Sequence, residues 1–318
     1  RGLSLHMYHS KECFQKLTNM TKQLQHFSLI HSKKHSSPQT EEQEHARQNK
    51  RIKLNGTSDD VAVKLGASGP FKILKQEITH DIIDEGFSEK VIKPGITTTE
   101  DVVWFLRQKV TDLGLETWFH PTIDVQRKYD PLKSHIESFS KQKEEEIIQE
   151  GDLLHCDFGI TYIGLNTDCQ QHAYVLKSDE NEVPAFLKAA FADGNRVQDI
   201  LTSNMKIGKT GDEILAISLV QGKKEGLRPS IYTHPLGTFG HSAGTTIGMW
   251  DSQNGVPFNG EYPLHKNTVY AIELNTTVAI KEWNKDIRIM LEEAGFFGNN
   301  TFEYVNERQT FIKPIKIN

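Results

Sequence analysis

The sequence predicts an α+β fold made of two similar halves. In the first half, apolar residues repeat at helical spacing in residues 71–91 and 97–113, and strand-like runs follow within residues 153–176. In the second half, two more helical patterns within residues 184–220 are again followed by short strands, from Ile231 onward. Helix pairs thus alternate twice with strand clusters, which indicates a duplicated α+β unit.

The composition is that of a globular protein with a sizeable core. The chain has 318 residues, of which 36% are hydrophobic and 25% charged, and its net charge is -5. These values exclude a disordered chain and are too acidic for a general nucleic-acid binder. No apolar run approaches the roughly 18–20 residues needed to cross a bilayer, so we expect a cytoplasmic protein without a membrane partner. The chain begins with Arg1 and not with Met, which leaves room for a processed leader.

Residues 1–65 are predicted to form a basic, histidine-rich arm or linker, and residues 66–318 the globular domain. Up to Asn55 the chain has ten lysines and arginines against four glutamates, together with six of the 14 histidines. Residues 31–53 are polar throughout, as is typical of a linker. Nuclear targeting or docking of an anionic partner by the basic residues 50–53 is the alternative to a partly helical tail.

The elements of the first half follow from apolar spacing and from capping residues. The first helix starts near Phe71 and has one apolar face, formed by Ile78, Ile82, Ile83, Phe87 and Val91. A Lys-Pro-Gly sequence at residues 93–95 breaks the chain, and the threonines and acids of residues 97–101 supply the N-cap of a second helix that ends at Gly114. Strands are expected at residues 153–158 and 172–176.

The second half repeats this order. Pro184 opens a helix whose apolar residues recur at intervals of three and four up to Leu201, and another helix fits residues 212–220. Beyond these helices, loops with glycine and proline separate short strands, which include residues 268–274 and 288–291.

Two aspartates lie near the ends of a predicted hairpin. Strand alternation puts His155 and Asp157 on the same face, so Asp157 points in the direction of buried residues. Asp168 follows 11 residues later, after a turn bracketed by Gly159 and Gly164. Two carboxylates at one point repel each other, and a divalent cation between them relieves the repulsion. For either acid alone, a solvated turn residue or a helix cap is the simpler interpretation.

Two histidines follow in a glycine-rich segment. His234 and His241 are seven residues apart, in a run that ends at Gly244 and Gly248. Glycines allow the backbone to approach a bound group closely. A single histidine of this kind is more often a loop or core residue than a ligand, so its interpretation depends on the acids nearby.

Two glutamates interrupt apolar strands near the end of the chain. Glu273 lies inside the apolar residues 269–274, and Glu292 and Glu293 follow the apolar residues 289–291. Four acids and one histidine set into hydrophobic strands suit a binuclear site, in which carboxylates neutralise and bridge two divalent ions. Strand alternation cannot put both adjacent glutamates on one face, so Glu293 is the alternative to Glu292 as the last ligand.

The order Asp, Asp, His, Glu, Glu with these spacings resembles the pita-bread metallopeptidase family, which includes methionine aminopeptidase, aminopeptidase P, prolidase and creatinase. The resemblance covers roughly residues 73–315. It is carried by Asp157-Phe158-Gly159 with Asp168, by His234-Pro235-Leu236-Gly237 with His241, and by Glu273 and Glu292. This family implies a pita-bread fold, a curved antiparallel sheet flanked by helices, in two pseudo-symmetric halves.

The resemblance also implies roles for individual residues. The metal ligands would be Asp157, Asp168, His234, Glu273 and Glu292. They would hold two divalent ions, with Mn favoured and Co, Fe or Zn as alternatives. A bridging hydroxide would attack a polarised carbonyl, with Glu273 as proton shuttle and His241 holding the substrate. For the other substrate-side histidine of the family, His120 is preferred over His135 because it lies in an apolar stretch.

The segments around His120, Asp157 and His234 look most like bacterial-type Xaa-Pro peptidases. This resemblance implies a homodimeric, metal-dependent exopeptidase that hydrolyses the Xaa-Pro bond of short peptides, of aminopeptidase P or prolidase type. The family's Glu-Pro-Gly is here Glu273-Leu274-Asn275 and its Arg-x-Glu is Met290-Leu291-Glu292. These departures keep a creatinase-like C–N hydrolase or a small-molecule lyase as alternatives. A non-catalytic peptide- or protein-binding module is a third, and nucleic acid is not an expected partner.

The hairpin has a consequence for two cysteines. If Asp157 and Asp168 face each other across it, Cys156 and Cys169 face each other on the opposite side, with Cβ atoms about 4.5–5.5 Å apart. We expect two free buried thiols, because a reducing compartment disfavours a disulfide between them.

Overall fold

The computed structural model describes residues 70–130, 145–162 and 164–316. The predicted arm of residues 1–65 and its boundary with the globular domain lie outside these residues, as do Cys13 and His135. Within the described part, none of the helices combines the length and the apolar character needed to cross a bilayer.

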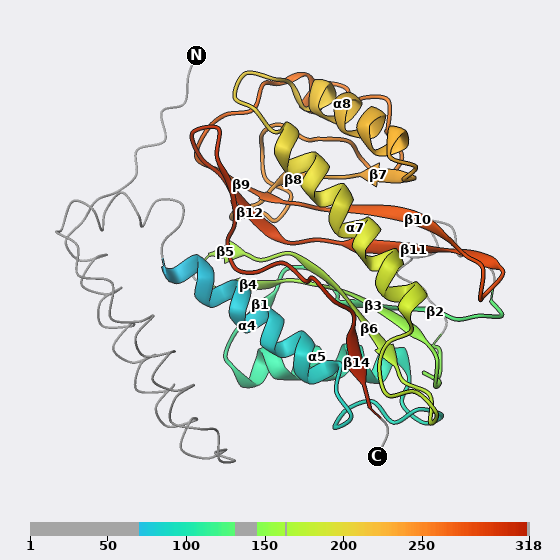
Figure 1. Cartoon of the computed structure of the whole chain (residues 1–318). Helices are drawn as coiled ribbons and strands as arrows, with labels where there is room; N and C mark the ends of the chain where they lie inside the picture. The colour runs from blue at the N-terminus through green and yellow to red at the C-terminus, as the bar shows by residue number, and fades with distance from the viewer. Residues whose placement is uncertain (1–69, 131–144, 163, 317–318) are drawn as a thin grey trace, which may run out of the picture. The chain divides into compact units, whose positions relative to one another are not determined.

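The first half consists of two helices against a four-stranded sheet (Figure 1). The helices are α4 (Pro70–Gly86) and α5 (Thr99–Asp112), and the sheet has the order β14-β6-β3-β2. Its strands are β2 (Thr122–Gln126), β3 (Leu153–Phe158), β6 (Cys169–Val175) and β14 (Lys313–Ile315). Only the pairing of β14 with β6 is parallel among these. A small second sheet joins β1 (Glu116–Thr117), β4 (Ile160–Tyr162) and β5 (Leu165–Asn166).

The second half repeats the arrangement with α7 (Ala185–Asn204) and α8 (Gly211–Lys224). One sheet has the order β11-β10-β7, formed by β7 (Pro229–Ile231), β10 (Leu274–Ile280) and β11 (Lys285–Leu291). The other has the order β13-β12-β9-β8, formed by β8 (His234–Pro235), β9 (Thr268–Ala271), β12 (Ala294–Phe297) and β13 (Phe302–Tyr304). A short 3-10 helix, η1 (Asn259–Glu261), lies in the loop before β9. In Figure 1, α7 lies across β10 and β11, which it contacts.

Capping boxes mark the starts of two helices. Thr98 caps α5 together with Asp101, within the predicted N-cap of residues 97–101. Thr210 caps α8 in the same way with Glu213, a cap that was not predicted. The first helix is shorter than its apolar spacing predicts. It ends at Gly86, and just beyond this end the Ser88 hydroxyl donates to the carbonyl of Glu85. Phe87 and Val91, which were predicted to lie on the helix, therefore belong to the turn that follows it.

The sheet of β3 and β6 separates two hydrophobic cores. Leu154 and Cys156 belong to the core under α4 and α5, whereas Leu153 and Tyr174 belong to the core under α7 and α8. Because successive residues of a strand point to opposite faces, the same two strands line both cores.

Buried side chains of the first sheet bind the backbone of β11 and join the two halves. Gln126 bonds to both the N–H and the carbonyl of Arg288, and the N–H of Met290 donates to Nε2 of His172. Further along, Gln170 and Glu292 form an isolated antiparallel bridge. Alternate residues of this strand and its extension are therefore held by the first half.

The register of the hairpin differs from the prediction by two residues. Asp157 lies opposite Gln170 and Cys156 opposite Gln171, so neither the two aspartates nor the two cysteines are direct partners. The connection between the strands forms a hairpin of its own, β4 and β5, and the Thr167 N–H donates to the Ile160 carbonyl. This extra hairpin shifts the start of β6 to Cys169. Cys156 and Cys169 are both free thiols, as expected.

The strand predicted over residues 268–274 is in fact two strands. It breaks at Ile272 and Glu273, so that β9 pairs with β12 while β10 pairs with β11. At the break, the Ile272 N–H donates to the Glu293 carbonyl, and the Tyr232 N–H donates to the Glu273 carbonyl. Glu273 therefore lies where the chain passes from one sheet to the other.

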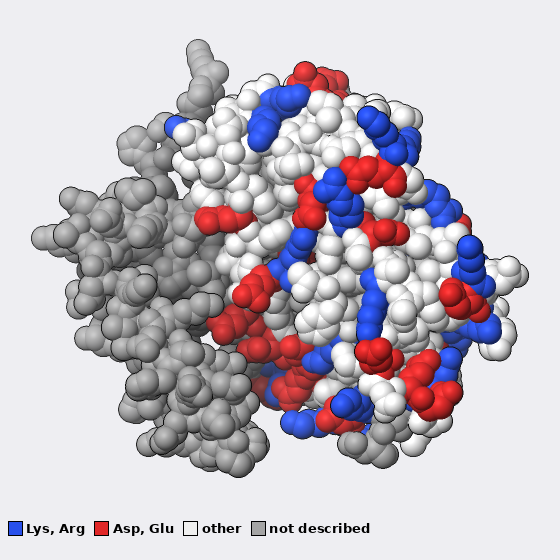
Figure 2. All heavy atoms as spheres, viewed as in Figure 1, with Lys and Arg blue, Asp and Glu red and all other residues white. Residues whose placement is uncertain are grey.

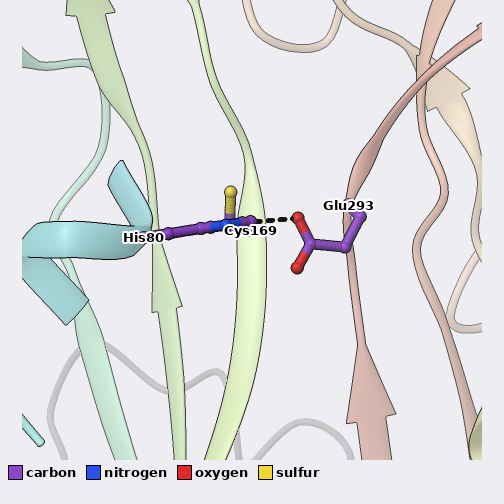
Figure 3. Close-up of side chains that lie close together, drawn as sticks. All are labelled: His80, Cys169 and Glu293. Atoms are coloured by element: carbon purple, nitrogen blue, oxygen red, sulfur yellow. Dashed lines mark hydrogen bonds and ion pairs between the residues drawn. The ribbon is translucent and has the colours of Figure 1, made fainter. Parts of the chain in front are cut away.

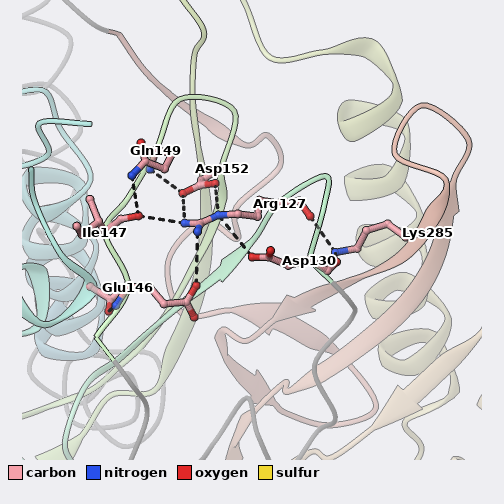
Figure 4. A network of polar contacts seen from close by, with 8 residues as sticks. Arg127, Asp130, Glu146, Ile147, Gln149, Asp152 and Lys285 are labelled. Atoms are coloured by element: carbon pink, nitrogen blue, oxygen red, sulfur yellow. Dashed lines mark hydrogen bonds and ion pairs between the residues drawn. The ribbon is translucent and has the colours of Figure 1, made fainter. Parts of the chain in front are cut away.

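An arginine holds the turn before β3 in place (Figure 4). The Arg127 guanidinium donates to both carboxylate oxygens of Asp152, at 2.9 and 2.8 Å, and to the Ile147 carbonyl at 3.1 Å. The Lys285 ammonium donates to the Arg127 carbonyl at 3.0 Å. Since Asp152 is 1% exposed, this bidentate pair fixes the entry of β3 against the end of β2.

Charges of both signs are mixed on the surface. On the face in Figure 2, lysine and arginine side chains lie among aspartates and glutamates over the described residues. Several form ion pairs, such as Arg196 with Glu225 at 2.7 Å and Arg228 with Asp286 at 2.6 Å. Within the described residues, this face has no extended basic surface.

Candidate metal centre

Five side chains predicted from the sequence converge between the two halves. Asp157 comes from β3, Asp168 directly precedes β6, His234 belongs to β8, Glu273 lies between β9 and β10, and Glu292 follows β11. Their potential ligand atoms lie within 4.8 Å of one another in two overlapping groups, His234 with Glu273 and Glu292, and Asp157 with Asp168 and Glu292. Glu292 is common to both groups.

The imidazole of His234 faces three carboxylates. Its Nε2 lies 3.7 Å from Asp168 Oδ2, 3.8 Å from Glu273 Oε2 and 3.6 Å from Glu292 Oε1. Because Nδ1 faces the Pro235 carbonyl at 3.3 Å, Nδ1 carries the hydrogen. Burial lowers the pKa of His234 to about 4, so the ring is neutral and the Nε2 lone pair points at the carboxylates.

The carboxylates destabilise one another's ionised forms. Burial and the charges of Glu292, Asp157 and Glu273 raise the pKa of Asp168 well above its usual range. Burial, Glu292 and Asp157 do the same for Glu273. Burial raises the pKa of Glu292 to about 8, against the hydrogen bonds from Gln170 and Asp168. A cation bound among these buried carboxyl groups would stabilise their ionised forms.

The residues present fit a divalent metal. Within the described residues, neither His234 Nε2 nor Glu292 Oε1 has a hydrogen-bond partner, although both atoms are buried. No lysine or arginine of the described ranges forms an ion pair with Asp168, Glu273 or Glu292. Metal bonds of about 2.1 Å separate neighbouring ligand atoms by roughly 3–4 Å, the spacing found around His234 Nε2. Carboxylates with one imidazole suit Mn, Fe, Co or Zn.

Gln170 was not predicted as part of this centre. Its amide nitrogen donates to Glu273 Oε1 at 3.0 Å and to Glu292 Oε2 at 2.9 Å, and the residue is 1% exposed. The predicted strand began at His172, which left Gln170 in a loop. Extending the strand by three residues would have put it on the same face as His172.

The second histidine of the glycine-rich segment lies at the open side of the centre. His241 is exposed, and its ring centroid is 4.4 Å from that of His234. Its ring also stacks on Tyr232 and meets the edge of Trp118, with centroids at 5.9 and 5.5 Å. The Trp118 indole is itself fixed by a hydrogen bond to the Thr167 carbonyl at 2.8 Å. His241 is therefore held between the ligand cluster and solvent.

His120 lies apart from the cluster. It is exposed, and its Nδ1 accepts a hydrogen bond from Arg107 of α5 at 2.7 Å. Among the described residues, it belongs to none of the groups of potential ligands. Its alternative, His135, lies outside the described residues.

Glu293 lies with His80 and Cys169 (Figure 3), whereas Glu292 belongs to the groups with His234 and the aspartates. Its Oε2 lies 2.8 Å from His80 Nε2 and accepts from Gln76 at 2.7 Å, and its Oε1 accepts from Gln171 at 3.3 Å. His80, Cys169 and Glu293 form a separate compact group of potential ligands. Unlike Glu292, however, Glu293 has a hydrogen-bond donor at each oxygen.

A comparison with protein-family models decides the classification. The model of "Metallopeptidase family M24" matches residues 75–294. The chain belongs to metallopeptidase family M24. This family uses divalent metals, and it confirms both the resemblance seen in the sequence and the pita-bread fold. A search of curated proteins finds no match.

Solved structures with the M24 fold are similar over most of the chain. The X-Pro aminopeptidase from Thermotoga maritima MSB8 is 18% identical, with a TM-score of 0.57 over 82% of this chain and 68% of that one. The prolidase from Pyrococcus horikoshii OT3 is 17% identical, with a TM-score of 0.53 over 80% and 68%. The methionine aminopeptidase from Thermotoga maritima is 18% identical, with a TM-score of 0.52 over 75% and 98%.

Proposed function

We propose that this M24 metallopeptidase is a binuclear exopeptidase that hydrolyses the Xaa-Pro bond of short peptides. The observation that supports it most is the convergence of four carboxylates and one neutral imidazole, with buried ligand atoms that lack hydrogen bonds within the described residues. The Xaa-Pro specificity is suggested by the sequence segments that resemble proline peptidases and by the similar structures of X-Pro aminopeptidase and prolidase.

The proposed ligands are Asp157, Asp168, His234, Glu273 and Glu292. Two Mn²⁺ ions bound there would supply Lewis-acid polarisation of the peptide carbonyl and activation of water near neutral pH. Glu292 is the last ligand in this proposal and not Glu293, because its free oxygen faces His234 while Glu293 is bound by donors on the other side.

The protein's own groups divide the remaining work. Glu273 keeps one oxygen against Gln170 and directs the other to the centre, where it is placed to take and return a proton. His241, exposed between Trp118 and Tyr232, is placed to hold the substrate on the solvent side. His120 is the proposed second substrate-side group, and to contact the substrate it would have to break its hydrogen bond with Arg107.

The test is release of proline or of the N-terminal residue from a panel of Xaa-Pro di- and tripeptides by Mn-loaded protein. Glu273→Gln should abolish turnover. Glu282→Gln, an exposed glutamate in the turn between β10 and β11, is the matched control and should leave turnover unchanged. His241→Ala and His120→Ala should lower kcat/KM while metal content stays the same.

Each outcome assigns the function. A preference for dipeptides over tripeptides would indicate a prolidase, and the reverse an aminopeptidase P type. A protein that holds two metals but leaves every peptide intact would contradict the proposal and favour a C–N hydrolase or lyase on the same site. A protein that binds no metal would favour a binding module.

A further inference from the structure

A chain of buried hydrogen bonds runs behind the metal centre. Asp124 Oδ2 lies 3.1 Å from His155 Nδ1, and His155 Nε2 lies 3.0 Å from Gln170 Oε1. The Gln170 amide nitrogen then reaches Glu273 and Glu292. Asp124, His155 and Gln170 are 4%, 0% and 1% exposed, so water does not compete for these bonds.

The backbone fixes the positions of these side chains. Asp124 pairs with His155 across β2 and β3, and Gln170 pairs with Asp157 across β3 and β6. On its other side, Gln170 exchanges backbone hydrogen bonds with Glu292. The glutamine is therefore held from both neighbouring strands directly beside the proposed ligands.

The orientation of the Gln170 amide follows from its neighbours. An amide NH₂ has two hydrogens, and here it faces one oxygen from each of two carboxylates, which matches two donors to two acceptors. Its oxygen then faces a ring nitrogen of His155, whose other nitrogen faces the Asp124 carboxylate. A flip of the amide would turn its oxygen against both glutamates and lose both donors.

The two glutamates are each left with one oxygen for a metal. Gln170 occupies Glu273 Oε1 and Glu292 Oε2, whereas Glu273 Oε2 and Glu292 Oε1 face His234 Nε2. A single side chain thus selects the ligating oxygen of two acids and sets the distance between them.

We propose that Gln170 is a positioning residue that presents Glu273 Oε2 and Glu292 Oε1 to the metals, and that His155 and Asp124 hold Gln170 in this orientation. The inference rests on the proposed metal centre but not on the identity of the peptide substrate. Groups that orient metal ligands typically contribute a factor of about 10–100 to metal affinity.

The test compares two adjacent glutamines. Gln170→Glu replaces the NH₂ donors by an acceptor of the same shape, beside two carboxylates of the centre. Gln171→Glu makes the same change on the opposite face, beside Glu293. We expect Gln170→Glu to weaken Mn²⁺ binding about 10–100-fold by calorimetry and to change the visible spectrum of the Co²⁺ protein, which reports the ligand geometry. Gln171→Glu should keep the Mn²⁺ affinity within about threefold and leave the Co²⁺ spectrum unchanged, since Glu293 is not among the proposed ligands.

A second variant distinguishes a local effect on metal binding from a general loss of folding. Gln170→Met keeps a similar shape without adding charge, and its unfolding should stay cooperative. We expect it also to lower Mn²⁺ affinity, with a fall in kcat larger than any change in KM. Asp124→Asn, which changes the hydrogen bond to His155, should shift the Co²⁺ spectrum in the same direction by a smaller amount.

The results separate this inference from the proposed function. Wild-type metal affinity and an unchanged Co²⁺ spectrum in folded Gln170→Met would overturn the inference, whatever the peptide assay shows. A protein that cleaves no Xaa-Pro peptide but binds metal in a Gln170-dependent way would overturn the proposed substrate and support the positioning role. A wild-type protein without metal affinity would overturn both.

Discussion

Two adjacent glutamates in the same extended segment have opposite environments. Glu292 faces other carboxylates and the lone pair of His234, and burial raises its pKa to about 8. Glu293 faces donors, because Gln76, Gln171 and His80 surround its two oxygens. Both residues are almost fully buried. Burial therefore does not distinguish the proposed metal ligand from the structural acid, whereas the balance of donors and acceptors around each carboxylate does.

The largest expected difference between the two glutamates is in metal binding. Glu292→Gln removes an oxygen from the centre, so we expect a loss of Mn²⁺ affinity greater than the roughly 10–100-fold typical of outer groups. Wild-type protein should gain about 2.7 kcal/mol of stability at a metal concentration of 100 Kd. Thermal unfolding with and without Mn²⁺ measures this gain, which Glu292→Gln should lose.

Glu293→Gln is the matched control. It should keep the stabilisation by Mn²⁺, although its stability without metal should fall because the ion pair with His80 is broken. If both variants lost the metal response equally, the distinction between the two sides of the strand would be wrong.

A smaller effect is expected on stability at the Glu293 side. Burial acts to lower the pKa of His80, but the charge and hydrogen bond of Glu293, with Asp84 and Asp81, raise it above its ordinary value. A raised pKa in the folded state means that the pair stabilises the fold fully below the unfolded pKa of about 6.5, and that this contribution is lost as pH rises through the folded value.

His80→Gln tests that dependence. We expect it to cost about 1–3 kcal/mol at pH 6, with the difference from wild type shrinking at higher pH. Urea unfolding at a series of pH values measures it, and a difference that grows with pH would contradict the assigned ion pair.

The smallest expected effect concerns the thiols beside Glu293 and Asp157. Burial, followed by the charges of Glu293, Asp168 and Glu292, raises the pKa of Cys169 well above its usual range, and burial does the same for Cys156. In a Cys13→Ser background, both should resist a thiol reagent in native protein and both should react after unfolding. If no thiol of the unfolded chain reacted in the absence of reductant, the two cysteines would form a disulfide instead.

Local signals predicted the helices well. The N-cap at Thr98 and the apolar spacing of the segments act over a few residues, and the structure has helices at all four predicted places. The first helix ends earlier than predicted, where the Ser88 hydroxyl donates a hydrogen bond to the Glu85 carbonyl of the last turn. Apolar spacing does not encode this contact.

The five proposed ligands were found because charged residues in apolar strands are costly unless they share a function. Gln170 could not be found in this way. Glutamine is an ordinary strand residue, and its importance depends on the register of β3 with β6 and on the bridge to Glu292. That register was wrong by two residues, since the β4–β5 hairpin inside the connection leaves no simple sequence pattern.

The attachment of β11 to the first half has a consequence for folding. Hydrogen bonds from β11 and from Glu292 just beyond it, to Gln126, His172 and Gln170, join residues that are 162, 118 and 122 positions apart in the chain. Contacts of such large sequence separation form late, because the intervening chain must first be ordered. A newly made chain therefore completes the ligand set only after both halves have docked, and a bound ion would retard unfolding far more than it would speed folding.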